Sequence, residues 1–509
     1  MRKILIFLIF VCCLTSCIST KKYNQKLNEK HPPQKLKEDL NILQTSLEEA
    51  HPGVFWYLSQ QKFKQEFDSL KNQLTDSLTS LEFYRKAAPL VSSIKCGHTR
   101  LVYPGLKYSK AQKDSLKNVG KLPLGLLDYF VLNDSLFIKK VNTTEEKVLK
   151  PGMQILKING DDVEDIIKKE EKYFSSDGYN TTFYPQVLNK SFANYYYAAF
   201  PKSDSVNFLI KDADTVFSYT LKRHSEKKVK HQLSKEEQLK KKKLTHEKRV
   251  FVRKNRYRGV DENQQALLDF KIDTYVKSTA ILTVKSFAFP HNNFHRFFRE
   301  SFKRIKEKNI QHLILDLRNN GGGNLMSCNL LFRYLYDKPY QFTGRANMSA
   351  RYFSTAKYAD HFLINSLRGI FPLIFVKKDS LGYYSKLPTD KLKNPKKYNY
   401  QGDLYVLING YSFSATSLLA ANLQEAKRGI FIGEETGGGY NQCTAGSIPY
   451  LSLPHTALKL RLPLKVIRPV HQRALYGRGV FPKYPIKTTL TDLLQKKDVA
   501  LQQAEALIR

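Results

Sequence analysis

The chain has 509 residues, of which 42% are hydrophobic and 25% are charged, and its formal net charge is +37 at pH 7. This length suffices for two to four domains, and the hydrophobic content excludes a chain that is disordered throughout. A basic excess suits nucleic acid or an anionic membrane surface. The sequence has no zinc-finger spacing and no nucleic-acid-binding signature, so we expect no nucleic-acid partner.

The N-terminus has the pattern of a secretory signal. Arg2 and Lys3 precede an apolar run over residues 4–14, which is too short to span a bilayer. The run ends in Leu-Thr-Ser-Cys, which resembles a bacterial lipobox. That resemblance implies that Cys17 becomes the lipidated N-terminus of the mature protein, and several acyl chains on one residue give stable anchoring.

We therefore expect a signal peptide over residues 1–17 and an exported protein of a bacterial cell envelope, lipid-anchored on the periplasmic or cell-surface side. The alternative is a plain secretory signal that is cleaved near Ser16. Residues 18–35 are mostly polar and contain two prolines, which predicts a flexible tether.

Residues 36–101 are predicted to form an N-terminal helical domain. Apolar side chains recur at helical spacing, as core positions do, at Leu40, Leu43, Leu47, Phe63, Phe67, Leu70 and Leu74. Near the end of this region lies a Gly-His-Thr turn that contains His98. On its own, such a histidine would be interpreted as a hydrogen-bonded structural residue.

Residues 120–222 are predicted to form an inserted, β-rich, PDZ-like domain. Its most specific stretch, residues 149–160, resembles the second half of a PDZ domain, although Met153 replaces the usual aspartate. A PDZ groove binds an extended C-terminus as an added strand, and backbone N–H groups capture the terminal carboxylate.

Within this domain, Leu124, Gly125 and Leu126 are the candidates for the carboxylate-binding loop, which would bind the tail of a substrate. The alternative is a lid or spacer without ligand. An aromatic-rich insertion over residues 161–204 favours that alternative because its side chains could fill the groove.

Residues 223–262 form a basic connector. From Lys222 to Arg258 the sequence contains 16 Lys and Arg against 4 Asp and Glu, a difference of +12. Runs of like charge are usually solvated and often disordered, and we expect the same here. The alternative is contact with anionic lipid head groups, which suits a membrane-anchored protein.

Two buried strands follow, and each ends in a turn that leads into a helix. The first runs from Leu313 to Leu317 and breaks at three glycines, which allow close approach of a ligand to the backbone. The second runs from Leu404 to Ile408 and leads to Ser414. A hydroxyl at a helix N-terminus lies where free N–H groups favour negative charge. The alternation of strands and helices predicts an α/β catalytic domain over residues 270–509.

The two turns together resemble the core of the C-terminal processing peptidases, or tail-specific proteases. The first matches Asp-Leu-Arg-x-Asn-x-Gly-Gly and the second matches Ser-x-Ser-Ala. The resemblance implies a mixed sheet with helices, like that of the ClpP and crotonase folds. It also implies acyl transfer with Ser414 as nucleophile, and an oxyanion held by the N–H groups of Ala415 and of Gly321 or Gly322.

The base is inferred from the same resemblance. Many members use a lysine in a Gly-Lys-Gly turn, but Gly439 occupies that position here. The Gly-His-Thr turn resembles the histidine-containing, tricorn-like subset, which implies that His98 is the general base. Glu434 or Glu435 could orient His98, and either could instead cap a turn or form a surface ion pair.

Three cysteines remain after the signal, at Cys96, Cys328 and Cys443, and their wide spacing fits neither a disulfide framework nor a metal site. We expect no metal and no cofactor, and a structural pair between Asp316 and Arg318. The predicted function is a serine endopeptidase that acts on protein or peptide tails, recognised by a free C-terminus. The alternatives are an inactive peptide-binding lipoprotein on the same fold and an envelope scaffold that works through the basic connector.

Overall fold

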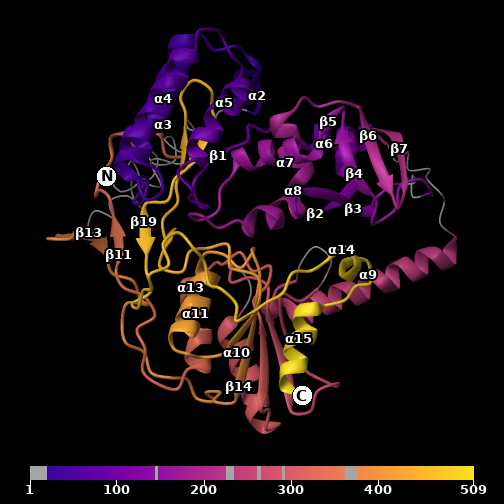
Figure 1. Cartoon of the computed structure of the whole chain (residues 1–509), viewed down its shortest axis with the longest axis vertical. Coiled ribbons are helices and arrows are strands. Elements are labelled where there is room, and N and C mark those ends of the chain that lie inside the picture. The colour runs from indigo at the N-terminus through magenta and orange to yellow at the C-terminus, as the bar shows by residue number, and fades with distance from the viewer. Residues whose placement is uncertain (1–19, 144–146, 225–233, 261–264, 289–292, 361–374) are drawn as a thin grey trace, which may run out of the picture.

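The computed structural model describes residues 20–143, 147–224, 234–260, 265–288, 293–360 and 375–509. The expected signal peptide and Cys17 lie outside these residues. Figure 1 shows N-terminal helices above, a β-rich unit beside them, and a sheet with helices below. In the described residues no helix is both long and apolar enough to cross a bilayer.

The N-terminal unit is built from helices that share one apolar core. The helices are α2 (Thr20–Asn28), α3 (Pro33–Ala50), α4 (Gln60–Gln73) and α5 (Ser80–Ser92). The expected flexible tether is wrong where the structure describes it, because α2 occupies much of it and Leu27 is only 4% exposed. His31 is also buried, and its Nε2 lies 3.0 Å from the Lys26 carbonyl. Packing against the following helices therefore orders this segment.

The β-rich unit is an antiparallel sheet in the order β2-β3-β4-β6-β7, with β5 paired to β4. The strands are β2 (Leu127–Leu132), β3 (Ser135–Val141), β4 (Gln154–Ile158), β5 (Asp161–Asp162), β6 (Ser205–Asp212) and β7 (Thr215–Lys222). The helices are α6 (Lys110–Val119), η1 (Pro123–Leu126), α7 (Val163–Glu170), η3 (Glu171–Tyr173) and α8 (Phe183–Ala199).

The predicted tail-binding loop is closed. Leu124 and Leu126 are 0% and 3% exposed, and the Leu124 N–H donates to the Tyr197 hydroxyl over 3.2 Å. The Gly125 N–H donates to the Leu122 carbonyl over 2.9 Å. The prediction that this loop binds a substrate tail is therefore wrong for this structure, because the loop is folded into a short helix and packed into the core of the unit.

The edge of the sheet beside that loop is covered as well. Helix α8 packs against β2, and the Val131 N–H donates to the Asn189 side chain over 2.6 Å. Strand addition needs free main-chain groups on an edge strand. Side chains of the aromatic-rich insertion thus occupy the groove that an added strand would use.

The basic connector contains a helix, α9 (Lys235–Asn255), followed by η4 (Arg256–Arg258). Figure 1 shows α9 extending away from the rest of the chain before the chain enters the lower sheet. The expectation of disorder is wrong for this part of the connector. Residues 225–233 and 261–264 lie outside the described residues.

The catalytic core is a six-stranded sheet in the order β20-β15-β14-β10-β9-β8. Its strands are β8 (Leu268–Ile272), β9 (Thr279–Val284), β10 (His312–Asp316), β14 (Asp403–Ile408), β15 (Ile430–Gly433) and β20 (Tyr484–Pro485). Only the pair of β8 and β9 is antiparallel within this sheet. The mixed α/β architecture of the core is therefore confirmed.

Helices cover both faces of this sheet. They are α10 (Phe294–Glu307), α11 (Leu325–Leu335), α13 (Ala415–Glu425) and α15 (Val499–Ile508), while the short α14 (Leu490–Leu494) lies near Gly152 of the β-rich unit. Leu313 and Leu315 of β10 face the core formed with α10, α11 and α13, whereas Ile314 faces the smaller core formed with α15. Side chains alternate across a strand, so an apolar run without polar interruption buries both faces.

Two smaller sheets complete the fold. One has the order β12-β13-β11-β19-β16 and the other β1-β18-β17. Their strands are β1 (Arg100–Val102), β11 (Ala346–Met348), β12 (Val376–Asp379), β13 (Gly382–Ser385), β16 (Cys443–Ala445), β17 (Tyr450–Ser452), β18 (Lys459–Arg461) and β19 (Lys465–Ile467), and η5 (Ser354–Tyr358) precedes β12. Because β1 pairs with β18, the segment after the N-terminal helices joins the catalytic core.

Candidate active site

Ser414 lies at the turn between β14 and α13 in an unusual backbone conformation. It is the N-cap residue of α13, with φ 58° and ψ −125°. Few non-glycine residues adopt positive φ, and such strain concentrates at functional sites. Hydrogen bonds hold the turn, because the Ser412 hydroxyl donates to the Leu317 carbonyl over 2.9 Å and accepts from the Asn409 N–H over 3.1 Å. The turn is thus fixed against the end of β10.

His98 meets this serine. Its Nε2 lies 3.0 Å from the Ser414 Oγ, and its ring stacks on Phe413 with a centroid separation of 4.8 Å. Arg461 donates from Nη1 to the His98 carbonyl over 2.7 Å, which fixes the main chain. Burial lowers the pKa of His98 to about 3, and the nearby Arg461 charge acts in the same direction. The imidazole is therefore neutral at pH 7 and can accept a proton.

No acid orients this histidine in the described part of the chain. The His98 Nδ1 is buried and has no hydrogen-bond partner there. Glu435 instead accepts from Arg478 Nε over 3.0 Å and from the Gly479 N–H over 2.7 Å. Glu434 accepts from Gln186 over 3.2 Å. The prediction that one of these glutamates orients His98 is wrong, and the geometry is that of a Ser–His pair.

Asp177 was not predicted from the sequence, yet it connects two parts of the site. Its buried carboxylate accepts from the Gly97 N–H over 2.9 Å and from the Gly439 N–H over 3.3 Å. Burial raises the pKa of Asp177 to about 6. Asp177 thus joins the turn that carries His98 to the turn that contains Gly439. Nothing in its local sequence distinguishes it from other acidic residues.

The main-chain donors expected near Ser414 are the N–H groups of Ala415 and of Gly321 or Gly322. The Gly322 N–H donates to the Asn320 side chain over 2.9 Å, so it is engaged within the chain. A Cβ on Gly321 would meet the Tyr411 ring at 3.2 Å. Among the described residues, the N–H groups of Ala415, Gly321 and Gly323 have no hydrogen-bond partner. All three residues line the cavities beside Ser414, so the expected donors Ala415 and Gly321 are available.

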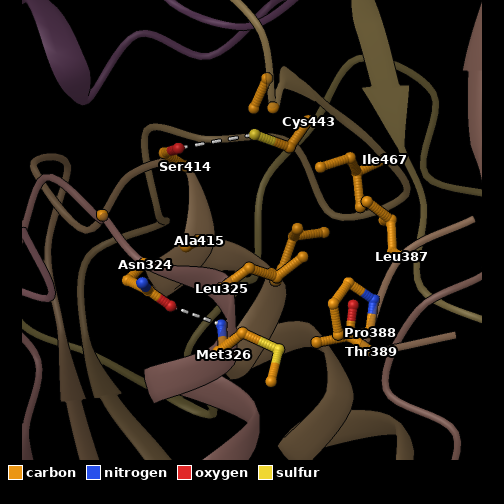
Figure 2. Close-up of a pocket in the computed structure, with 14 residues that line it drawn as sticks. Asn324, Leu325, Met326, Leu387, Pro388, Thr389, Ser414, Ala415, Cys443 and Ile467 are labelled. Atoms are coloured by element: carbon orange, nitrogen blue, oxygen red, sulfur yellow. Dashed lines mark hydrogen bonds between the residues drawn. The ribbon is translucent and has the colours of Figure 1, made fainter. Parts of the chain in front are cut away.

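Two cavities adjoin Ser414. The first, of about 230 Å³, is mainly apolar. Figure 2 shows Leu325, Leu387 and Ile467 around it, with Ser414 at its upper edge and the Cys443 Sγ 3.6 Å from the Ser414 Oγ. The second cavity, of about 500 Å³, is lined by His98 together with Lys285, Tyr411 and Arg461, among others. Ser414 therefore stands between an apolar and a basic recess.

The sequence analysis also singled out an Asp316–Arg318 pair and three cysteines. Arg318 pairs with Asp316 over 2.7 Å, as expected, and also with Asp498 at the N-terminus of α15 over 2.6 Å. Cys96, Cys328 and Cys443 are free thiols and buried. The residues that the structure describes contain no group of three His, Cys, Asp or Glu that could hold a metal.

Comparisons with known proteins agree with this geometry. Residues 278–483 match the model of peptidase family S41. No curated protein matches the chain. Mature CPAF in complex with lactacystin is similar in structure, with a TM-score of 0.63 and 13% identity over 94% of this chain and 98% of that chain. A crystal structure of mature CPAF has a TM-score of 0.60 and 14% identity over 94% and 96%.

A putative peptidase from Parabacteroides merdae has a TM-score of 0.46 and 12% identity over 94% of this chain and 97% of that chain. At these identities the likeness to the two CPAF structures establishes the fold alone. The family model contributes more, because the matched residues contain both the glycine turn and the turn at Ser414. Over residues 278–483 the chain belongs to peptidase family S41, the C-terminal processing or tail-specific proteases, and the protein is a serine peptidase.

Proposed function

We propose that this peptidase is an endopeptidase that cleaves protein or peptide tails through an acyl-enzyme, with Ser414 as nucleophile and His98 as general base. The observation that carries the proposal is the separation of 3.0 Å between the His98 Nε2 and the Ser414 Oγ. A serine hydroxyl is a weak nucleophile until an adjacent base takes its proton. The neutral, buried imidazole is in the state that this step requires.

The reaction then follows from the groups around Ser414. Its Oγ attacks the scissile carbonyl while His98 takes the proton, and His98 later returns that proton to the leaving amine. We assign the oxyanion to the N–H groups of Ala415 and of Gly321 or Gly323, and each such donor typically contributes about 10²–10³ in rate. In the second half of the reaction, water attacks the acyl-enzyme with His98 again as base, and Ser414 is released. Without a carboxylate on Nδ1, the imidazolium is stabilised less than in a Ser–His–Asp triad.

Each of the two cavities receives one side of the substrate. The general acid must stand beside the leaving nitrogen, so the cavity lined by His98 receives the leaving-group side. The apolar cavity in Figure 2 then receives the side chain on the acyl side. We propose that an apolar residue at this position is preferred, because Leu325, Leu387 and Ile467 offer no polar partner.

We also propose that the protein is anchored in the cell envelope through Cys17. The support is the order of features over residues 1–17, in which two basic residues are followed by an apolar run and then by Leu-Thr-Ser-Cys. The exposed basic helix α9 would add attraction to anionic lipid. Metabolic labelling with a radioactive fatty acid tests the anchor, and label that persists in a Cys17→Ser variant would exclude it.

The test of catalysis is casein cleavage and fluorophosphonate labelling by a soluble form that begins after Cys17. We expect activity in the wild type and loss in Ser414→Ala and His98→Ala. A His471→Ala variant is the control, because this histidine is exposed. Labelling that persists in Ser414→Ala would show that Ser414 is not the nucleophile. A wild type that neither cleaves nor labels would favour the inactive peptide-binding protein.

A further inference from the structure

A segment between η3 and α8 contacts the turns on both sides of the Ser–His pair. It covers residues 175–182 and carries Asp177, whose side chain is buried. We propose that Asp177 is a positioning residue, which acts through the main chain to fix the separation between the His98 Nε2 and the Ser414 Oγ. This inference rests on the function proposed above, because that function makes the separation matter for the reaction.

One oxygen of Asp177 holds the turn that carries the base. The Gly97 N–H, directly before His98, donates to the Asp177 Oδ1 over 2.9 Å. On its other side Gly97 is packed against the Phe413 ring, since a Cβ on the glycine would lie 2.6 Å from that ring. The His98 ring stacks on the same phenylalanine. The turn is therefore held between the carboxylate and the residue that precedes the nucleophile.

Two further hydrogen bonds align the segment with this turn. The Ser175 hydroxyl donates to the Cys96 carbonyl over 2.9 Å, and the Gly178 N–H donates to the Lys95 carbonyl over 2.9 Å. Both bonds flank the one that Asp177 accepts. The carboxylate is thus fixed in place by its own neighbours and can in turn fix the base.

The other oxygen of Asp177 holds a turn that rests on the nucleophile. The Gly439 N–H donates to the Asp177 Oδ2 over 3.3 Å. Gly438, the residue before it, lies directly against the main chain of the nucleophile, because a Cβ on Gly438 would be 2.8 Å from the Ser414 nitrogen. One side chain therefore connects the turn of the base with the turn that supports the serine.

A carboxylate is the side chain that suits both contacts. Both partners are main-chain N–H donors, and an ionised carboxylate offers two acceptor oxygens and no donor. An amide offers one acceptor oxygen and would place its NH2 group against the other N–H. Among the described residues no cation forms an ion pair with Asp177. Burial of such a charge costs free energy, and perturbed carboxylates cluster at functional sites.

The test compares Asp177→Asn and Asp177→Ala with the wild type, using the soluble protein that begins after Cys17. Burial raises the pKa of Asp177 to about 6, so the assay is run at pH 8, where the carboxylate is ionised. The kcat and KM are measured for one peptide with an apolar residue on the acyl side. The rate of fluorophosphonate labelling measures the reactivity of Ser414 without a peptide.

We expect Asp177→Asn to lower kcat and the labelling rate by about 10-fold or more, the factor that hydrogen bonds to charged groups contribute. Asp177→Ala should lower both by about 100-fold, because it frees both turns and a displacement of about 1 Å has that effect. KM should stay close to its wild-type value in both variants, since Asp177 lines neither cavity beside Ser414.

Asp39 provides a matched control. It is a buried aspartate of α3, and it accepts from the His455 N–H over 3.2 Å and from the Thr456 N–H over 2.7 Å. These donors lie in the loop between β17 and β18, which contributes no residue to the two cavities. Asp39→Asn should lower the midpoint of thermal unfolding but leave kcat unchanged. Thermal unfolding is measured for every variant.

A double variant separates positioning from general damage. His98→Ala removes the base, so a residue that acts by placing the base against Ser414 has nothing left to place. We expect the residual labelling rate of His98→Ala to be the same with and without Asp177→Asn, at a probe concentration high enough to measure it. An equal fold loss in both backgrounds would overturn the inference.

A wild-type kcat in Asp177→Asn would overturn the inference as well, and so would an equal loss of kcat in Asp39→Asn. Each of these results leaves the peptidase function intact. Failure of the proposed function has a different signature, because the wild type itself would then neither cleave the peptide nor label at Ser414.

Discussion

Gly322 lies against Ser414 so closely that a Cβ on the glycine would be 2.7 Å from the Cβ of the serine. The φ of Gly322 is +94°, which side-chain-bearing residues rarely adopt. The same Cβ would stand 2.9 Å from the Ala415 nitrogen. The glycine turn therefore fixes how near the nucleophile and its oxyanion donor come to the end of β10.

We expect Gly322→Ala to lower kcat/KM by about 100-fold or more, since a displacement of about 1 Å at reacting groups has that effect. The rate of fluorophosphonate labelling measures it independently of the substrate. Gly321→Ala is the control, because its Cβ would meet only the edge of the Tyr411 ring at 3.2 Å. Equal losses in both variants would show that the close approach at Ser414 is not what limits the rate.

The lowered pKa of His98 predicts a specific pH dependence of activity. The folded protein holds this pKa at about 3, compared with 6.5 for a free imidazole. His98 therefore stays deprotonated well below pH 6.5, and kcat/KM should not fall through a transition near pH 6.5. A pH profile of kcat/KM with an uncharged peptide checks this. A fall by half near pH 6.5 would contradict it.

The same shift has a consequence for stability. Since the folded pKa lies below the unfolded one, the unfolded chain binds the proton first as the pH falls. The contribution of neutral His98 is complete above pH 6.5 and is lost between pH 6.5 and about 3, by about 1.4 kcal/mol per pH unit. Asp177, whose pKa is raised to about 6, changes in the opposite direction between about pH 4 and 6.

Denaturant unfolding at several pH values, compared between the wild type and His98→Gln, isolates the histidine from Asp177. We expect the stability of the wild type to fall more steeply with decreasing pH below 6.5 than that of the variant. Parallel curves would contradict the shift.

A substitution of Glu435 tests whether this residue orients His98. Its carboxylate binds Arg478 and the Gly479 N–H and does not contact His98. Glu435→Gln should destabilise the protein by about 1–3 kcal/mol, because it weakens a buried charged network. The pH profile of kcat/KM should keep its shape. Thermal unfolding and the pH profile are measured together, and a profile displaced by a pH unit would restore Glu435 as an orienting acid.

The apolar cavity predicts specificity on the acyl side. Leu387 lines it together with Leu325 and Ile467 (Figure 2). Leu387→Ala should raise kcat/KM for a bulky apolar residue relative to alanine by about 10-fold, because one to two methylenes of space change by that factor. Leu381→Ala is the control, since Leu381 is 79% exposed in the nearby hairpin. A ratio that is the same in both variants would place the acyl side chain elsewhere.

Ser414 and His98 were located through short turns that resemble those of a known family, since on its own the Gly-His-Thr turn would indicate a structural histidine. The strands of the core were predictable, since Leu313, Ile314 and Leu315 are buried on both faces. These features depend on a few consecutive residues.

The predictions that the structure contradicts failed because the residues concerned contact segments that are distant in the sequence. Glu435 turns toward Arg478, and the loop at Leu124 is closed by Tyr197, so in both cases a distant segment supplies the partner. Asp177 accepts from main-chain N–H groups, which every residue type except proline can offer. Helix α2 is ordered because Leu27 is buried by other helices. Such contacts depend on tertiary packing that local patterns do not encode.

The pairing of β1 with β18 joins the segment that carries His98 to one that lies 363 residues further along the chain at Arg461. A polypeptide that has been synthesised only as far as α13 already contains Ser414, yet it lacks the strand against which the segment of His98 is held. We therefore expect proteolytic activity only when nearly the whole chain has been made and folded.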